Sequence, residues 1–123
     1  MQSSETTGGQ APVGRPVRLK DGARLFDRPV NEFRRAHLSG EIKTREFNGV
    51  LIIPPTEIER LRETFGEGGL SRDLQKTAEE LGWPYDRVYA AARRGDIRTE
   101  WWCGRRRVSD AEMERLRREI IVA

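Results

Sequence analysis

Cysteine and histidine are scarce in this 123-residue sequence, which contains one residue of each. A single cysteine excludes an internal disulfide, and one cysteine with one histidine excludes a zinc site made of these two ligand types. The sequence also lacks any apolar run of membrane-spanning length, and its N-terminal stretch has no apolar signal core. We therefore expect a soluble, cytoplasmic protein that has no metal site and no membrane partner.

Patterns typical of catalysis are absent as well. The sequence contains no phosphate loop, no nucleophile elbow and no cluster of metal ligands. Its many carboxylates fall at predicted helix starts or beside arginines on helical faces, where helix capping and surface ion pairs explain them. We therefore expect no enzymatic activity, no catalytic residues and no cofactor.

Charge is what the sequence has in abundance. Charged residues make up 35% of the chain and hydrophobic residues 36%, with a net charge of +3. This balance suits one or two small domains with modest cores better than one large domain. The slight positive charge permits binding to nucleic acid but does not require it.

Residues 1–18 are rich in Gly, Ser, Thr, Gln and Pro and hold few apolar side chains. This composition predicts a disordered N-terminal tail. Either the tail is a plain flexible extension, or Arg15 and Arg18 form a basic arm that enters a DNA groove beside the folded part.

The stretch over 77–116 predicts two helices joined by a tight turn. Apolar spacing predicts a first helix over 71–81, Gly82 allows the turn, and Pro84 begins a second helix that Gly95 ends. The second helix has small apolar residues on one face and a basic, aromatic surface suited to a DNA groove on the other. The candidate DNA-binding residues on this helix are Tyr85, Arg87, Tyr89, Arg93 and Arg94. Among them, Arg87 has the geometry best suited to a guanine contact.

A basic hairpin with strands over 98–102 and 105–108 follows. Because strand side chains alternate, we expect Arg105 and Arg107 to face away from the core and Arg106 to point inward. Arg105 and Arg107 are then candidates for contacts with the DNA backbone or minor groove. The alternative is a solvated edge that discourages strand pairing.

Four further residues complete this stretch. Ser109 and Glu112 predict a capping box for a third helix. Trp101 and Trp102 are expected to pack within the hairpin, and the alternative for one of them is a position on the sugar-phosphate backbone.

The runs TAEELG, VYAAARRGDI, GRRRV and SDAEMERL occur in this order and resemble the excisionase and MerR-type DNA-binding domains. The resemblance covers about forty residues. It implies a winged helix-turn-helix with a recognition helix, an arginine-rich wing and a closing helix. The chain departs from the family at Trp83, where a smaller apolar residue is usual, and at Pro84, where a serine or threonine cap is usual. The resemblance implies either an excisionase-like directionality factor in DNA recombination or a small transcriptional regulator.

The chain also repeats itself without a gap at an offset of 55 residues. Residues 19–63 and 74–118 share 13 identities in 45 positions, where chance gives roughly 3. We therefore predict a mainly α fold with small β-hairpin wings, arranged as two tandem winged helix-turn-helix domains. These domains are expected over 19–65 and 71–123, with a flexible Gly-rich linker over 66–70.

In the first copy, helices are predicted over 20–26, 29–39 and 56–65, and strands over 43–47 and 50–53. The second helix of this copy exposes Glu32 and Leu38 in the prediction, and Glu32 opposes phosphate binding. The candidate DNA-binding residues of this copy are Asn31, Arg34, Arg35 and Lys43.

The hairpin of the first copy is apolar where the second is basic. Val50, Leu51 and Ile52 stand where the second copy has three arginines. Alternation places Val50 and Ile52 on the outer face, so we expect them to contact another protein.

Two similar modules in head-to-tail order predict binding to double-stranded DNA at direct-repeat half-sites, about 10–10.5 bp apart. The expected partners are DNA, an integrase or recombinase or RNA polymerase, and further copies along the DNA, in a nucleoid-associated protein. The alternative is an adaptor in which only the second domain binds DNA. In that case, Val50 and Ile52 engage an integrase, a polymerase or another copy.

Overall fold

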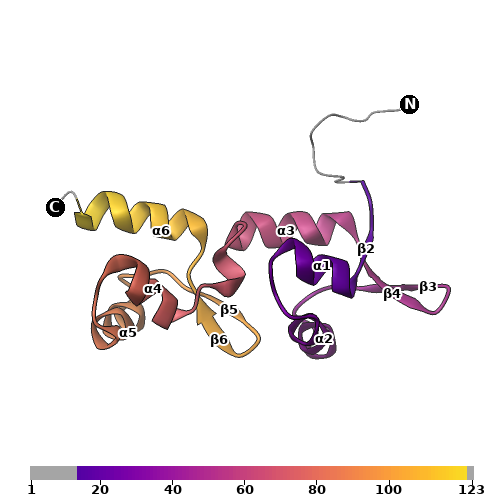
Figure 1. Cartoon of the computed structure of the whole chain (residues 1–123), viewed down its shortest axis with the longest axis horizontal. Coiled ribbons are helices and arrows are strands. Elements are labelled where there is room, and N and C mark those ends of the chain that lie inside the picture. Colours follow the sequence, from indigo (N-terminus) through magenta and orange to yellow (C-terminus); the bar gives the residue numbers. More distant parts are fainter. Residues whose placement is uncertain (1–13, 122–123) are drawn as a thin grey trace.

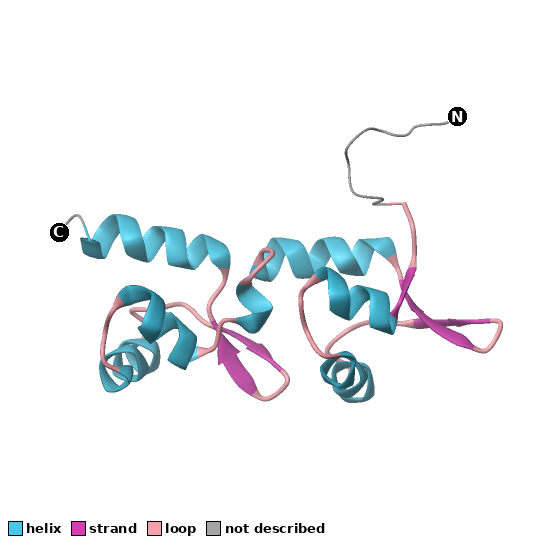
Figure 2. Ribbon diagram, in the orientation of Figure 1, coloured by secondary structure: helices cyan, strands magenta, loops and turns pink. Residues whose placement is uncertain are grey.

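A computed structural model of the chain describes residues 14–121 (Figure 1). The fold is mainly helical with two small antiparallel sheets, as the sequence predicted. Two successive units have the same element order of helix, helix, hairpin and helix (Figure 2). We call residues 17–65 the N-unit and residues 73–121 the C-unit.

The N-unit is built around a three-stranded sheet with the strand order β2-β4-β3. Val17 pairs with Ile53 across β2 and β4, so the predicted disordered tail is wrong at its last two residues. Residues 1–13 of that tail lie outside the described part of the chain. The elements of the N-unit are β2 (Val17–Arg18), α1 (Leu19–Leu25), α2 (Val30–Ser39), β3 (Arg45–Phe47), β4 (Val50–Ile53) and α3 (Pro55–Phe65).

The C-unit follows a short 3-10 turn, η1 (Gly69–Ser71). The helix predicted over 71–81 begins only at Leu74, because the Asp73 carboxylate caps it by accepting a hydrogen bond from the Lys76 backbone N–H. The elements of the C-unit are α4 (Leu74–Leu81), α5 (Tyr85–Arg94), β5 (Glu100–Trp102), β6 (Arg105–Arg107), α6 (Asp110–Leu116) and η2 (Arg117–Ile121).

The two units match at the offset of 55 residues down to their backbone conformation. Left-handed residues sit between the first two helices of each unit, Asp27 with φ 56° and Gly82 with φ 72°. The hairpin turns are equally alike, because Asn48 has φ 51° and Cys103 has φ 50°. The repeat seen in the sequence therefore reflects a repeat of the fold.

A buried carboxylate at the start of the last helix braces the N-unit. Glu57 accepts a hydrogen bond from Arg60 Nε at 3.0 Å and one from the Lys43 backbone N–H at 3.0 Å. Burial alone raises the pKa of Glu57, but these hydrogen bonds outweigh burial and hold it below its ordinary value.

Glu112 does the same in the C-unit, with Arg115 Nε at 2.9 Å and the Arg98 backbone N–H at 2.9 Å. The predicted capping box is therefore only half formed. Ser109 Oγ accepts the Glu112 backbone N–H at 3.1 Å, whereas the Glu112 carboxylate turns away to Arg98 and Arg115.

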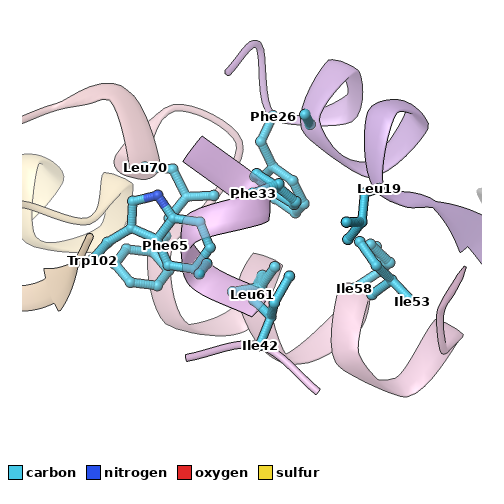
Figure 3. Close-up of a cluster of buried hydrophobic side chains, with 12 residues drawn as sticks. Leu19, Phe26, Phe33, Ile42, Ile53, Ile58, Leu61, Phe65, Leu70 and Trp102 are labelled. Atoms are coloured by element: carbon cyan, nitrogen blue, oxygen red, sulfur yellow. The ribbon is translucent and has the colours of Figure 1, made fainter. Parts of the chain in front are cut away.

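The two units share part of their core. One hydrophobic cluster belongs to the C-unit alone, but the N-unit cluster includes Trp102 from the second hairpin. The Trp102 ring lies 5.3 Å from Phe33 and 6.1 Å from Phe65, edge-on to both (Figure 3). Hairpin β5–β6 therefore fastens the C-unit onto the N-unit.

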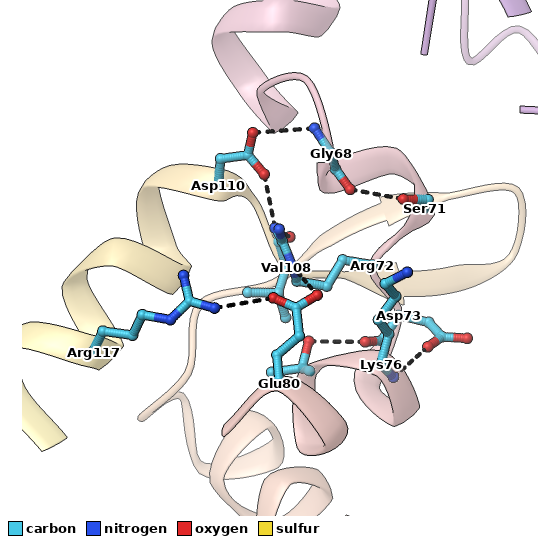
Figure 4. Close-up of polar contacts among 10 residues, drawn as sticks. Gly68, Ser71, Arg72, Asp73, Lys76, Glu80, Val108, Asp110 and Arg117 are labelled. Carbon is cyan, nitrogen blue, oxygen red and sulfur yellow. Dashed lines mark hydrogen bonds and ion pairs between the residues drawn. The ribbon is translucent and has the colours of Figure 1, made fainter. Parts of the chain in front are cut away.

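The segment predicted as a flexible linker is a packed junction (Figure 4). Its Leu70 side chain is fully buried in the N-unit cluster, and its Gly68 backbone N–H donates to Asp110 Oδ2 at 3.1 Å. Arg72 Nη1 donates to the Val108 carbonyl at 3.0 Å and to Asp110 Oδ1 at 2.9 Å. These contacts fix the start of α6 against the chain that leaves the N-unit.

Candidate nucleic-acid interface

An open cleft of about 720 Å³ lies between α5 and hairpin β5–β6. Both of its walls come from the C-unit, one from a helix and one from a hairpin. It is lined by Asp73, Leu74, Gln75, Tyr85, Tyr89, Trp101, Gly104, Arg105 and Arg106.

The helical wall is a row of aromatic and basic side chains on α5. Val88, Ala91 and Ala92 bury the neighbouring stripe of this helix in the core. Helical spacing then places Tyr85 and Tyr89 one turn apart, and their rings stack at 6.1 Å. The Arg93 guanidinium lies 6.0 Å from the Tyr89 ring and continues the row beyond the residues that line the cleft. The sequence predicted Tyr85, Tyr89 and Arg93 on one exposed surface, and the structure brings the three side chains together.

The hairpin wall is formed by Trp101 and Arg106, which pair directly across the two strands. Trp101 is 62% exposed, and the Arg106 guanidinium lies 5.2 Å from the centre of its ring. Arg106 Nη1 also donates to Thr99 Oγ1 at 3.1 Å. Arg106 was expected to point inward, and this prediction is wrong, because its side chain lines the open cleft and is only half-buried.

Arg107 was expected on the outer face, in contact with DNA, and this prediction is wrong. Its side chain does point away from the core of its own unit, but the N-unit covers that face, and Arg107 is only 4% exposed. Arg107 Nε donates to the Trp102 carbonyl at 3.3 Å, and Nη2 lies 3.9 Å from Glu32 Oε1. Burial lowers the pKa of Arg107. Arg105 stays exposed, with Nη1 3.5 Å from Asp73.

Glu32 was expected on the surface of α2, and this prediction is also wrong. Glu32 Oε2 accepts the Trp102 indole N–H at 2.7 Å and Arg28 Nε at 2.7 Å, in the buried seam between the units. Burial alone raises the pKa of Glu32, but the hydrogen bonds from Arg28 and Trp102 hold it below its ordinary value. Glu32 therefore belongs to the contact between the two units, and its negative charge does not lie on the outer surface of α2.

Arg87 and Arg94 are exposed, as predicted, but neither lines the cleft. The Arg87 guanidinium lies 4.0 Å over the Trp83 ring, and Arg94 Nε is 2.9 Å from Asp96 Oδ2. Both arginines therefore lie outside the cleft.

The candidate residues of the N-unit are all exposed, but they do not form a comparable cleft wall. Arg34 takes the position of Tyr89, and its Nη1 donates to Asn31 Oδ1 at 3.1 Å. Glu46 takes the position of Trp101, so the aromatic stack of the C-unit has no counterpart here. The exposed candidates are Asn31, Arg34, Arg35 and Lys43.

The apolar hairpin of the N-unit differs in detail from its prediction. Val50 is exposed, whereas Ile52 is half-buried because it is paired on both sides, with Arg18 and with Arg45. Phe47 is more exposed than either, at 64%. Sequence reasoning passed over Phe47, although its match to Trp102 in the repeat was the signal that could have found it.

The described residues contain no group of three or more His, Cys, Asp or Glu side chains placed to hold a metal ion. No helix within residues 14–121 has both the length and the apolar character needed to cross a membrane. The chain matches no protein-family model, no curated protein and no solved structure.

Proposed function

We propose that the protein binds double-stranded DNA in a sequence-specific manner through two winged helix-turn-helix units. The observation that carries this proposal is the cleft of the C-unit, where a helix and a hairpin present aromatic rings and guanidinium groups to one open space. In this arrangement α5 enters the major groove, and hairpin β5–β6 lies on the backbone or in the minor groove. The residues assigned to the contact are Tyr85, Tyr89, Arg93, Trp101, Arg105 and Arg106.

One arginine in the cleft and one beside it are held in a way that suits phosphate or base contacts. Arg93 and Arg106 rest on the rings of Tyr89 and Trp101, which orient a guanidinium without neutralising it. Arginines on the hairpin position the protein on the backbone, and side chains of α5 read base edges.

The N-unit supplies a second, weaker contact through α2. Its exposed residues Asn31, Arg34 and Arg35 occupy the helix that corresponds to α5. Because Trp102 and the junction fasten the two units together, the distance between α2 and α5 is set by the fold. We therefore expect direct-repeat half-sites at one fixed spacing, about 10–10.5 bp. Either an excisionase-like architectural role or transcriptional regulation fits such binding.

Selection of bound sequences from randomised duplex DNA, followed by titration of the enriched site at several salt concentrations, tests the proposal. We expect enrichment of a direct repeat and a steep salt dependence. Arg105→Glu with Arg106→Glu should weaken binding by more than tenfold. The matched control, Arg24→Glu with Arg118→Glu, reverses the same charge on exposed residues away from the cleft and should change affinity little. Failure to enrich any sequence, or equal losses in both double variants, would contradict the proposal.

A second candidate function is a protein adaptor in which only the C-unit touches DNA. The observation in its favour is the exposed apolar hairpin, with Phe47 and Val50. Arg34→Glu with Arg35→Glu separates the two functions. Specific binding should be lost if both units read DNA, and it should persist, with an unchanged salt slope, in an adaptor.

A further inference from the structure

Within the described residues, the contact between the two units leaves each unit with one unused half of the same contact. Within the chain, hairpin β5–β6 of the C-unit docks on the N-unit. The N-unit carries an equivalent hairpin that docks on no second unit within residues 14–121, and the C-unit carries α5 and Asp96 at the positions of α2 and Glu41. We propose that the protein self-associates head to tail. Hairpin β3–β4 of one copy docks on the C-unit of a second copy.

The internal contact defines what such docking requires. Trp102 inserts its ring beside Phe33 and donates its indole N–H to Glu32. At the turn of the same hairpin, the Cys103 backbone N–H donates to Glu41 Oε1 at 2.8 Å. Besides the packing of Trp102 against Phe65 and Leu70, the contact has two parts that the repeat offers again, an aromatic ring against α2 and a turn N–H on a carboxylate.

The inserting half is repeated on hairpin β3–β4. Phe47 stands 55 residues before Trp102 and is 64% exposed, a large apolar surface for a residue of a small protein. Asn48 stands at the position of Cys103, with the same left-handed backbone. Its backbone N–H is therefore presented at the turn in the same way. Figure 1 shows this hairpin projecting away from the C-unit, at the end of the molecule.

The receiving half is repeated on the C-unit. Asp96 stands at the position of Glu41 and is exposed. The two carboxylates are even held alike, because Ser39 Oγ donates to Glu41 Oε2 at 2.8 Å and Arg94 Nε donates to Asp96 Oδ2 at 2.9 Å. Asp96 can therefore accept the turn N–H of Asn48 from another copy.

The two receiving surfaces carry different side chains, and each set matches the aromatic residue that would insert there, Trp102 on the N-unit and Phe47 on the C-unit. In the N-unit, Arg28 and Glu32 form an ion pair whose carboxylate meets the indole N–H of Trp102. In the C-unit, the same two positions hold Trp83 and Arg87, with the guanidinium 4.0 Å over the ring. Phe47 has no N–H to donate, and an aromatic ring packs well on a guanidinium and an indole. Each surface therefore suits the hairpin that reaches it.

The geometry of the repeat makes this association open-ended. The inserting and receiving surfaces lie on different units, so the contact is heterologous and does not close as a two-fold dimer. In Figure 1, α3 and α6 follow one another along one side of the molecule, and α2 and α5 lie on the opposite side. Copies added in the same way extend the row. The inference does not depend on DNA binding, because neither half uses the cleft residues.

Sedimentation velocity without DNA, over protein concentrations rising to millimolar, tests the proposal. The weight-average mass of the wild-type chain should rise continuously above the 14.2 kDa monomer, without a plateau at the dimer. Phe47→Asp removes the inserting half and Asp96→Arg removes the receiving half, so each variant alone should stay monomeric. An equimolar mixture of the two retains one complete contact and should form heterodimers that grow no further.

Leu38→Asp is the matched control, because Leu38 is 81% exposed on α2 and belongs to neither half. It should associate like the wild type. Circular dichroism checks that every variant folds, and Phe47→Ser serves as a milder second variant at the inserting half. A wild-type chain that stays monomeric throughout, or variants that associate as the wild type does, would overturn the proposal. Homodimers of either single variant would also overturn it, since they require a two-fold contact.

Discussion

Hairpins β3–β4 and β5–β6 share their turn conformation and strand pairing, but only the outer face of β5–β6 is covered by the other unit. On β5–β6 that face meets the N-unit, where Trp102 is 1% exposed. On β3–β4 the matching face is open, and Phe47 is exposed. The comparison teaches that one position of the repeat is a core position or a surface position according to its neighbour. A hairpin sequence alone does not reveal which.

Truncating the two matching aromatic rings should give the largest difference in stability between the two hairpins. Trp102→Ala should destabilise the protein by about 3–5 kcal/mol, because it empties part of the N-unit core and leaves the Glu32 carboxylate without its indole partner. Phe47→Ala removes a solvent-exposed ring and should change stability by less than about 0.5 kcal/mol. Chemical denaturation followed by circular dichroism measures both values. Equal losses in the two variants would show that the hairpins have equivalent surroundings.

The two units share a buried carboxylate at the start of their last helix, and this feature should make the stability of both units sensitive to acid. Hydrogen bonds lower the pKa of Glu57 and Glu112 below the ordinary value of 4.5, despite burial. A lowered folded pKa contributes stability that is fully present above the unfolded value and is lost as pH falls through the folded value. The free energy of unfolding should therefore decline below about pH 4.5.

Glu57→Gln with Glu112→Gln should lower stability at neutral pH and make this acid decline shallower. Exposed Glu59→Gln is the matched control and should leave neutral-pH stability unchanged. Unfolding by urea across a pH series measures the effect. An acid decline as steep in the double variant as in the wild type would assign it to other groups.

The smallest expected effect concerns the turn between the first two helices of each unit. Gly82 has φ 72° with nothing near its missing Cβ, so Gly82→Ala should cost about 1 kcal/mol from backbone strain alone. Asp27 already tolerates φ 56° at the matching position, and Asp27→Gly should therefore stabilise slightly or leave stability unchanged. Thermal unfolding of the two variants measures the difference, and a destabilised Asp27→Gly variant would contradict this reasoning.

Much of the local structure was predictable from the sequence because short-range chemistry determines it. Pro84 and Gly95 bounded α5, as the sequence predicted. Two features were missed for different reasons. Asp73 shortened α4 by capping it through the Lys76 backbone N–H, a local contact that the spacing could have shown. Glu112 left the capping box for the Arg98 backbone N–H, which is distant in sequence and is brought close by the fold.

The candidate site divides in the same way. Helical periodicity was enough to gather Tyr85, Tyr89 and Arg93 on one face of α5. It could not show that the hairpin would bring Trp101 and Arg106 to the same cleft. Whether Arg105 or Arg107 stayed exposed depended on the length of hairpin that the N-unit covers.

By itself, the sequence determined the repeat, the order of helices and hairpins, and the faces on which side chains fall, because propensity, capping and alternation act over a few residues. Only the tertiary structure decided that the two units share a core. Trp102, Glu32 and Arg107 left the surface because burying an indole against Phe33 and Phe65 removes apolar area from water, and a paired carboxylate satisfies the polar atoms that go in with it. Which residues are buried between the units depends on which surfaces of the two units meet, and only the folded chain determines that.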